Sequence, residues 1–280
     1  MYFTKMHGLG NDYIYVNGIT EHIREPERLA VRLSDRHFGA GADGLILILP
    51  SKRADFRMDI YNADGSRAEM CGNGIRCLAK YVYDRGLTKK KELIIETDAG
   101  MRRLWLETDE EDKISRVTVD MGYPIFQADK IPIISGHTRV VQEPILIRHM
   151  EYRMTGVSMG NPHAVVWVNS VKRLDLAQIG PEFEYHGRFP RRVNVEFAQV
   201  VDREHIIVRV WERGAGETLA CGTGACAVAA AGVLNDLTER HVTVKLKGGE
   251  LSVLWDEADG KMYMTGPAVT VYDGIVTVEK

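Results

Sequence analysis

The sequence predicts two copies of a mostly β unit, each curved around a central helix. The main observation is a repeat: Cys71 opens Cys-Gly-Asn-Gly and Cys221 opens Cys-Gly-Thr-Gly, an offset of 221 − 71 = 150. The same offset relates two further pairs, Gly10-Asn11 with Gly160-Asn161 and Asn62 with Glu212. Three landmarks in register imply that one structural unit occurs twice.

Short segments with strand patterning occupy much of both halves. The continuous apolar run 45–49 is typical of a buried strand, whereas other segments alternate with a period of two. The alternating segments are 56–61, 117–121, 164–168, 206–211, 242–246, 251–255 and 261–264. Turn sequences rich in Gly and Asp separate them, so we expect sheets of short strands.

Three helices are predicted. Residues 27–35 have helical spacing after Pro26, which is favourable in a first turn. Residues 72–85 and 222–237 form the other two, each beginning just after a repeated cysteine. The last helix is apolar on almost every face, which predicts that it is buried inside its unit.

The repeat also suggests where the chain divides. Gly122 and Pro124 follow a predicted strand, and the repeat restarts beyond them. We therefore expect a first half over 1–121 and a second over 122–267. The remaining segment 268–280 is expected to return as a strand and complete the first half.

Composition excludes several classes of protein. The 280 residues are 45% hydrophobic and 27% charged with a net charge of −3, and no long basic run offers a nucleic-acid surface. The first residues lack the apolar stretch of a signal peptide, and the longest apolar run, 225–234, is too short to span a membrane. Four cysteines spaced C-x5-C and C-x4-C suit neither a disulfide framework nor zinc. We expect a cytoplasmic protein without nucleic-acid, membrane or metal partners.

Cys71 and Cys221 are the strongest candidates for chemistry. Each precedes Gly-x-Gly and a predicted helix, where the helix dipole and unpaired backbone N–H groups lower the pKa of a thiol. A lone cysteine in this context is a small buried residue beside a turn, but two in register favour a function. The backbone N–H groups that could hold a carboxylate there are those of Gly72, Asn73, Gly222 and Thr223.

Two activated thiols allow three kinds of chemistry. They can form a redox disulfide, or act as a nucleophile and a resolving group. They can also flank one carbon, one removing a proton while the other delivers a proton to the opposite face. That reaction inverts a stereocentre and needs a site that stabilises a developing carbanion.

Several polar residues accompany the cysteines. Four asparagines lie in turn-like sequences, where a turn role is the ordinary interpretation: Asn11, Asn62, Asn161 and Asn194. Glu212-Arg213 could bind a second ammonium and carboxylate or form a surface ion pair. His163 could orient a substrate, assist proton transfer or be structural.

Together these motifs resemble the diaminopimelate epimerase family, the cofactor-independent two-cysteine amino-acid epimerases and racemases. The matching stretches, in family order, are 7–12, 62–66, 70–77, 158–163, 192–194, 212–218 and 220–226, and 263–268 is similar to the closing strand. The resemblance covers essentially the whole chain.

The resemblance implies an α/β (α+β) fold of two pseudo-symmetric domains, each a curved, mostly antiparallel β-sheet wrapped around a central helix, with the active site between them. It implies an isomerase that converts LL-2,6-diaminopimelate to the meso form in lysine and peptidoglycan precursor biosynthesis. The enzyme would be a homodimer that needs neither pyridoxal phosphate nor metal.

The resemblance also implies roles for single residues. Cys71 and Cys221 would be the acid–base pair, and the four backbone amides named above would hold the carboxylate at the reacting centre. The distal end of the substrate would be bound by Asn11, Asn62, Asn161, Asn194, Glu212 and Arg213. Some members carry a substrate-contacting Gln where this chain has Gly44, which puts one contact in doubt. Cys77 and Cys226 are interpreted as buried and structural.

Three other functions compete with this one. A racemase of the same fold acting on proline, hydroxyproline or another amino acid should tolerate replacement of Arg213. A thiol redox protein should need a Cys71–Cys221 disulfide, which would inactivate an epimerase. A non-catalytic amino-acid-binding module should bind its ligand without exchanging a Cα proton.

Overall fold

The computed structural model describes residues 1–277 and forms two compact units. The first contains Met1–Asp120 and the chain from Thr265 onward, and the second contains Met121–Met264. Of the predicted returning segment 268–280, residues 278–280 lie outside the described residues. In the described part, no helix is long and apolar enough to cross a membrane.

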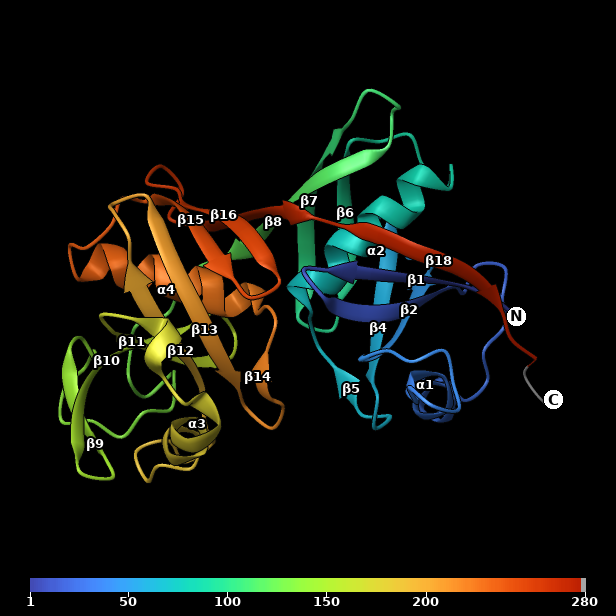
Figure 1. Cartoon of the computed structure of the whole chain (residues 1–280). Coiled ribbons are helices and arrows are strands. Elements are labelled where there is room, and N and C mark those ends of the chain that lie inside the picture. Colours follow the sequence, from blue (N-terminus) through green and yellow to red (C-terminus); the bar gives the residue numbers. More distant parts are fainter. Residues whose placement is uncertain (278–280) are drawn as a thin grey trace. The chain divides into compact units, whose positions relative to one another are not determined.

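The first unit is a mostly antiparallel sheet with two helices. Its strands are β1 (Tyr2–Gly8), β2 (Asn11–Asn17), β3 (Gly44–Leu49), β4 (Phe56–Asn62), β5 (Arg67–Ala68), β6 (Glu92–Thr97), β7 (Gly100–Thr108), β8 (Ile114–Gly122) and β18 (Val269–Ile275). They pair in the order β18–β1–β2–β3–β4–β6–β7–β8, with β2–β3 and β4–β6 parallel. In Figure 1, β18 therefore lies alongside β1 although the two strands are at opposite ends of the chain.

The second unit repeats this plan. Its strands are β9 (Glu143–Ile147), β10 (Met150–Ser158), β11 (Pro162–Trp167), β12 (Asn194–Val200), β13 (His205–Glu212), β14 (Gly216–Thr218), β15 (His241–Leu246), β16 (Gly249–Trp255) and β17 (Met262–Pro267). They pair in the order β9–β10–β11–β12–β13–β15–β16, with β11–β12 and β13–β15 parallel.

A central helix packs on the inner face of each sheet, α2 (Gly72–Asp84) in the first unit and α4 (Gly222–Leu234) in the second. Helix α4 contacts β10, β11 and β12 and also β15 and β16 towards the other end of the sheet order, so the sheet curves around it. Its alanines and glycines allow this close approach on all sides, and nearly every residue is buried. This confirms the predicted fold class.

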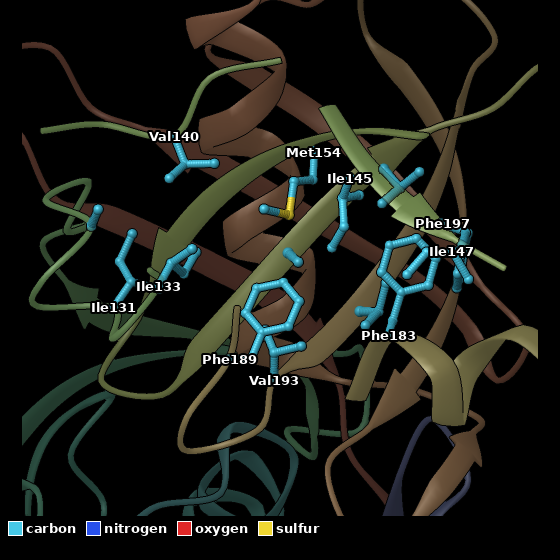
Figure 2. Close-up of a cluster of buried hydrophobic side chains, with 14 of the residues drawn as sticks. Ile131, Ile133, Val140, Ile145, Ile147, Met154, Phe183, Phe189, Val193 and Phe197 are labelled. Carbon is cyan, nitrogen blue, oxygen red and sulfur yellow. The ribbon is translucent and has the colours of Figure 1, made fainter. Parts of the chain in front are cut away.

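A second helix covers the outer face of each sheet, α1 (Pro26–Ser34) and α3 (Leu176–Glu184). Alternation along the strands supplies both faces: Val195 and Phe197 of β12 belong to the outer core under α3, and Glu196 between them points inward. Figure 2 shows this outer core, where Phe183 of α3 packs edge-on against Phe197. Helix α1 covers a matching core in the first unit.

The two units agree in register as well as in plan. The bounds of α3 are those of α1 shifted by 176 − 26 = 150 and 184 − 34 = 150, and α4 stands in the same relation to α2. The strand register is also repeated: Tyr13 pairs with Gly44, and His163 pairs with Asn194, 150 residues later in each strand. Equivalent positions in the two units can therefore be compared residue by residue.

The helices differ from prediction in two respects. Helix α4 ends at Leu234, not at 237, because Asn235 caps it with a side-chain bond to Ala231 O (2.5 Å) and Asp236 adopts φ 53°. Leu237 then donates back to Gly232 O, which closes the end with a Schellman-type turn. Helix α3 was not predicted, although the offset from α1 indicates it; Pro181 within it is an unfavourable helix residue.

Candidate active site

Cys71 is the N-cap residue of α2. Its backbone is extended (φ −139°, ψ 111°), and its Sγ accepts the N–H of Gly74 at 3.3 Å. A side chain in this position normally offers oxygen to the first helical turn, so the thiol takes the place of a Ser or Asp cap. The sulfur consequently sits at the positive end of the helix dipole.

Asn11, at the start of β2, contacts this thiol. The Cys71 Sγ lies 3.4 Å from Asn11 Oδ1. The same oxygen accepts a hydrogen bond from Asn73 Nδ2 at 3.4 Å. The amide of Asn11 is oriented by Asp43, because its Nδ2 donates to Asp43 Oδ2 at 2.8 Å. The first unit thus brings together Cys71, Asn11 and Asn73, three of the predicted site residues.

A buried arginine braces the same helix start. Arg76 is 0% exposed, and its guanidinium donates to Gly72 O (3.0 Å), to Asn73 Oδ1 (2.8 Å) and to Pro267 O (3.1 Å). These bonds satisfy a cation that would be costly to bury alone. Arg76 thereby fixes the backbone and side chain on which the predicted carboxylate site depends.

Gly44 and Asn62 face each other across β3 and β4. A Cβ on Gly44 would lie 2.2 Å from Tyr61 O and 2.8 Å from the Tyr13 ring, so a side chain at position 44 would force the adjacent strand to shift. Asn62 bonds locally, with Nδ2 donating to Ser66 Oγ at 3.0 Å. The polar contact missing at Gly44 is therefore accounted for by packing.

Cys221 is the N-cap residue of α4 and repeats the arrangement. Its Sγ accepts the N–H of Gly224 at 3.4 Å and lies 3.5 Å from Thr223 Oγ1. Asn161, equivalent to Asn11, donates from Nδ2 to Thr223 Oγ1 at 3.2 Å. Asn161 therefore reaches the second thiol through Thr223, whereas Asn11 contacts the first thiol directly.

The charge around Cys221 differs from expectation. Burial raises the pKa of the Cys221 thiol well above its ordinary value, and the nearby carboxylates of Glu212 and Glu196 raise it further. Bonds from Thr223 and the Gly224 amide act in the opposite direction but are outweighed. The helix N-terminus was expected to lower the pKa of Cys221, but burial and the two acids outweigh it. The sequence does not show which side chains surround the thiol.

Glu212 lies at the end of β13, and its carboxyl is itself perturbed. Burial raises its pKa above the ordinary value, while hydrogen bonds with Thr218 and Cys221 act to lower it. Thr218 donates to its Oε1. The Cys221 thiol and the Glu212 carboxyl therefore each affect the pKa of the other.

The side chain of His163 is fully buried and bonded at both ring nitrogens. Its Nδ1 lies 2.7 Å from Glu196 Oε1, and its Nε2 lies 3.0 Å from Asn161 Oδ1. Both His163 and Glu196 are 0% exposed. Sequence reasoning missed Glu196, which looks like one strand residue among apolar neighbours; the inward alternation of β12 is the signal that could have found it.

Asn194 and Arg213 are linked to each other. Asn194 Oδ1 accepts the backbone N–H of Arg213 at 2.9 Å, and Asn194 Nδ2 donates to Pro162 O at 3.0 Å. The Arg213 guanidinium donates to Arg191 O at 3.0 Å. The buried carboxylate of Glu184 holds the next residue by accepting the N–H of Gly214 at 2.9 Å. Asn194 thus fixes the backbone that carries Arg213.

Within residues 1–277, no group of three or more His, Cys, Asp or Glu side chains is arranged to hold a metal ion. Cys77 and Cys226 lie inside α2 and α4, whereas Cys71 and Cys221 cap the starts of these helices. Burial raises the pKa of Cys77 from 9.0 to about 11. Cys226 is also completely buried, inside α4.

Comparison with known proteins agrees with this geometry. The sequence profile described as "Diaminopimelate epimerase" matches residues 3–127 and 155–271. A diaminopimelate epimerase of Acetivibrio thermocellus is 55% identical over 280 residues, covering 100% of both chains. One of Methanococcus maripaludis is 53% identical, covering 99% of this chain and 100% of the relative. A Bacillus anthracis phenazine biosynthesis protein of the PhzF family has the same fold at 16% identity (TM-score 0.70, 99% of each chain).

The repeated sheet-and-helix units and their capping thiols thus define an isomerase of the amino-acid epimerase class. The chain belongs to the diaminopimelate epimerase family.

Proposed function

We propose that this chain interconverts LL- and meso-2,6-diaminopimelate by proton transfer between two thiols, in lysine and peptidoglycan precursor biosynthesis. The family and the full-length identity of 55% to a named diaminopimelate epimerase support the substrate. The chemistry rests chiefly on one observation, that Cys71 and Cys221 cap equivalent helices through bonds from Gly74 and Gly224.

The two thiols act on one substrate carbon. In one direction a thiolate removes the Cα proton while the other thiol delivers a proton to the opposite face, and the roles exchange in reverse. Because the pKa of Cys221 is raised, Cys221 carries a proton at neutral pH, and Cys71 is then the base when Cys221 donates. Each turnover moves one proton on and one proton off, so no redox partner is needed.

The α-carboxylate is bound by amides at the two helix starts. The N–H groups of N-terminal helical residues have no partner within the helix, and we assign this role to those of Gly72, Asn73, Gly222 and Thr223. As the Cα proton leaves, negative charge grows on the carboxylate oxygens. Fixed N–H dipoles aimed at those oxygens stabilise the carbanion without reorganising.

The distal amino-acid end is assigned to a second set of polar groups. These are Asn11, Asn62, Asn161, Asn194, Glu212 and Arg213. Arg213 supplies a planar guanidinium suited to a distal carboxylate, and Asn194 contributes by holding the Arg213 backbone. His163 assists from a buried position through Asn161.

The proposal includes the state of the enzyme. We expect a cytoplasmic homodimer active without pyridoxal phosphate or metal. Sedimentation at micromolar concentration tests the dimer. Activity that survives both a chelator and hydroxylamine, which removes pyridoxal phosphate, tests cofactor independence.

The reaction is tested by α-proton exchange. Reduced protein is incubated in D2O with LL-diaminopimelate, and the α-proton is followed by NMR for wild type, Cys71→Ala and Cys221→Ala, with L-proline as a control substrate. We expect loss of the α-proton signal together with meso product in wild type, and neither in the variants. Exchange with proline alone would assign the chain to a sister racemase, and binding without exchange would leave a binding module. Activity only after oxidation would favour a redox protein.

A further inference from the structure

The second unit contains a buried ionisable pair, His163 and Glu196, of which the proposed function gives no role to Glu196. His163 on β11 and Glu196 on β12 come from adjacent parallel strands, and both point inward towards α4. The Nδ1–Oε1 distance is 2.7 Å, and neither side chain is exposed. The other carboxylate oxygen, Oε2, is buried and has no hydrogen-bond partner within residues 1–277. The bond to His163 is therefore what compensates the burial of this acid.

The pair is connected to the Cys221 thiol by consecutive polar contacts. His163 Nε2 lies 3.0 Å from Asn161 Oδ1, and Asn161 Nδ2 lies 3.2 Å from Thr223 Oγ1. Thr223 Oγ1 lies 3.5 Å from Cys221 Sγ. A change in the hydrogen-bonding state of the imidazole can thus reach the thiol through one amide and one hydroxyl.

The fold itself does not require this pair. By the 150-residue offset, the first unit has Tyr13 where the second has His163, and Ile46 where it has Glu196. Ile46 is completely buried and lies against Gly74, as Glu196 lies against Gly224. Since an apolar residue fills this position in an equivalent unit, a buried carboxylate here indicates a role other than packing.

We propose that Glu196 is a positioning residue that acts through His163. An ionised carboxylate only accepts hydrogen bonds, so Glu196 keeps a proton on Nδ1 and leaves Nε2 to face Asn161. The Asn161 amide presents its oxygen to Nε2, so Nε2 donates to Asn161 while the amide NH2 donates to Thr223. The opposite end of the same amide faces Thr223, and so Glu196 sets the hydrogen bond offered beside Cys221.

Glu196 packs closely against the start of α4. A Cβ on Gly224 would lie 2.6 Å from Glu196 Oε1, so the carboxylate packs directly against the first turn of α4. Glycine at position 224 is what allows the carboxylate to approach so closely.

The test is the tautomer of His163, measured by 15N NMR of the imidazole in the full-length protein. A His163→Gln sample assigns the ring signals by their absence. The probe is Glu196→Gln, which keeps the size of the side chain but offers both an oxygen and an NH2. We expect wild type to show Nδ1 protonated and Glu196→Gln to show the Nε2–H tautomer. The matched control is Glu184→Gln, another buried carboxylate of this unit, which should leave the His163 signals unchanged.

The effect of Glu196 on catalysis rests on the proposed function, and it is measured by enzyme kinetics and not by the NMR experiment. In Glu196→Gln we expect kcat with LL-diaminopimelate to fall roughly 10- to 100-fold, the range seen when an orienting outer residue is lost, with a KM change below about threefold. A wild-type ring protonated on Nε2 alone would overturn the proposal, and so would a variant whose tautomer changes while kcat does not. The NMR result needs no substrate. An inactive wild type with an Nδ1-protonated ring would therefore count against the proposed function and not against the positioning of His163.

Discussion

Ile46 and Glu196 occupy equivalent positions in the two units and press on the same point of the central helix. An ideal Cβ on Gly74 would lie 2.6 Å from Ile46 Cδ1, and one on Gly224 would lie 2.6 Å from Glu196 Oε1. Identical spacing with opposite chemistry shows that the repeat preserves backbone and packing while the chemical character of each half diverges.

This relationship predicts unequal effects of the same mutation. A methyl group at position 224 must displace a carboxylate held by His163, whereas at position 74 it meets the rotatable end of an isoleucine. We expect Gly224→Ala to lose about 1–3 kcal/mol of unfolding free energy and Gly74→Ala to lose less. Both variants gain the same helix propensity, about 1 kcal/mol, so the difference between them reports the packing. Urea unfolding of the two variants measures the difference, and equal losses would contradict it.

Gly44→Ala should destabilise the protein through backbone overlap. The new Cβ would lie 2.2 Å from Tyr61 O in the adjacent strand, where no side-chain rotation can relieve the clash. We expect a loss of about 1–3 kcal/mol or more in urea unfolding. Gly136→Ala is the control, because no atom lies within 4 Å of its Cβ position. A stable Gly44→Ala protein would mean that β3 and β4 can separate.

Arg76→Met should be severely destabilising. The substitution removes the donors to Gly72 O, Asn73 Oδ1 and Pro267 O in a buried site. Each buried hydrogen bond from the charged guanidinium contributes about 1.5–3 kcal/mol, so we expect a total loss of about 3 kcal/mol or more. Arg103→Met is the comparison, since its ion pair with Glu92 is exposed and contributes about 1 kcal/mol or less. Chemical denaturation distinguishes the two, and similar losses would argue against the bracing role.

Glu212→Gln should lower the pKa of Cys221. Burial remains, but the second contribution that raises this pKa, the charge of Glu212, is removed. Peptide-resolved alkylation by iodoacetamide across a pH series should show Cys221 reacting at lower pH than in wild type. Glu217→Gln serves as the control, because that carboxylate pairs with Arg209. An unchanged pH midpoint would leave burial and the charge of Glu196 as the causes of the raised pKa.

Cys77 should make stability fall at alkaline pH. Its pKa is raised by burial from 9.0 to about 11, so the folded state retains a proton that the unfolded state releases. The stabilisation is complete below about pH 9 and is lost as pH rises through about 11, amounting to roughly 2–3 kcal/mol. Comparing urea unfolding at about pH 8 and about pH 11, Cys77→Ala should lose less stability than wild type. Equal losses in the two proteins would contradict this assignment.

The sequence predicted the central helices well because their signals are local. Cysteine and glycine mark the start of α2 and of α4, and the apolar pattern carries each one forward. Helix α2 ends at Asp84, one residue before the predicted end, and α4 ends at Leu234 and not at 237, since Leu237 continues the apolar pattern while Asp236 turns left-handed. Helix α3 was missed because Pro181 argues locally against a helix that packing against the outer core stabilises.

The sequence by itself determined the repeat, the two capping cysteines and the class of protein. These depend on residue identity and spacing, which a chain shows directly. Only the tertiary structure decided that Glu196 lies behind His163, that Arg76 braces the start of α2, and that burial with two carboxylates raises the pKa of Cys221. Desolvation and charge–charge interaction depend on which side chains meet after folding, and residues 33 apart in the chain, such as His163 and Glu196, meet only because β11 and β12 pair in parallel.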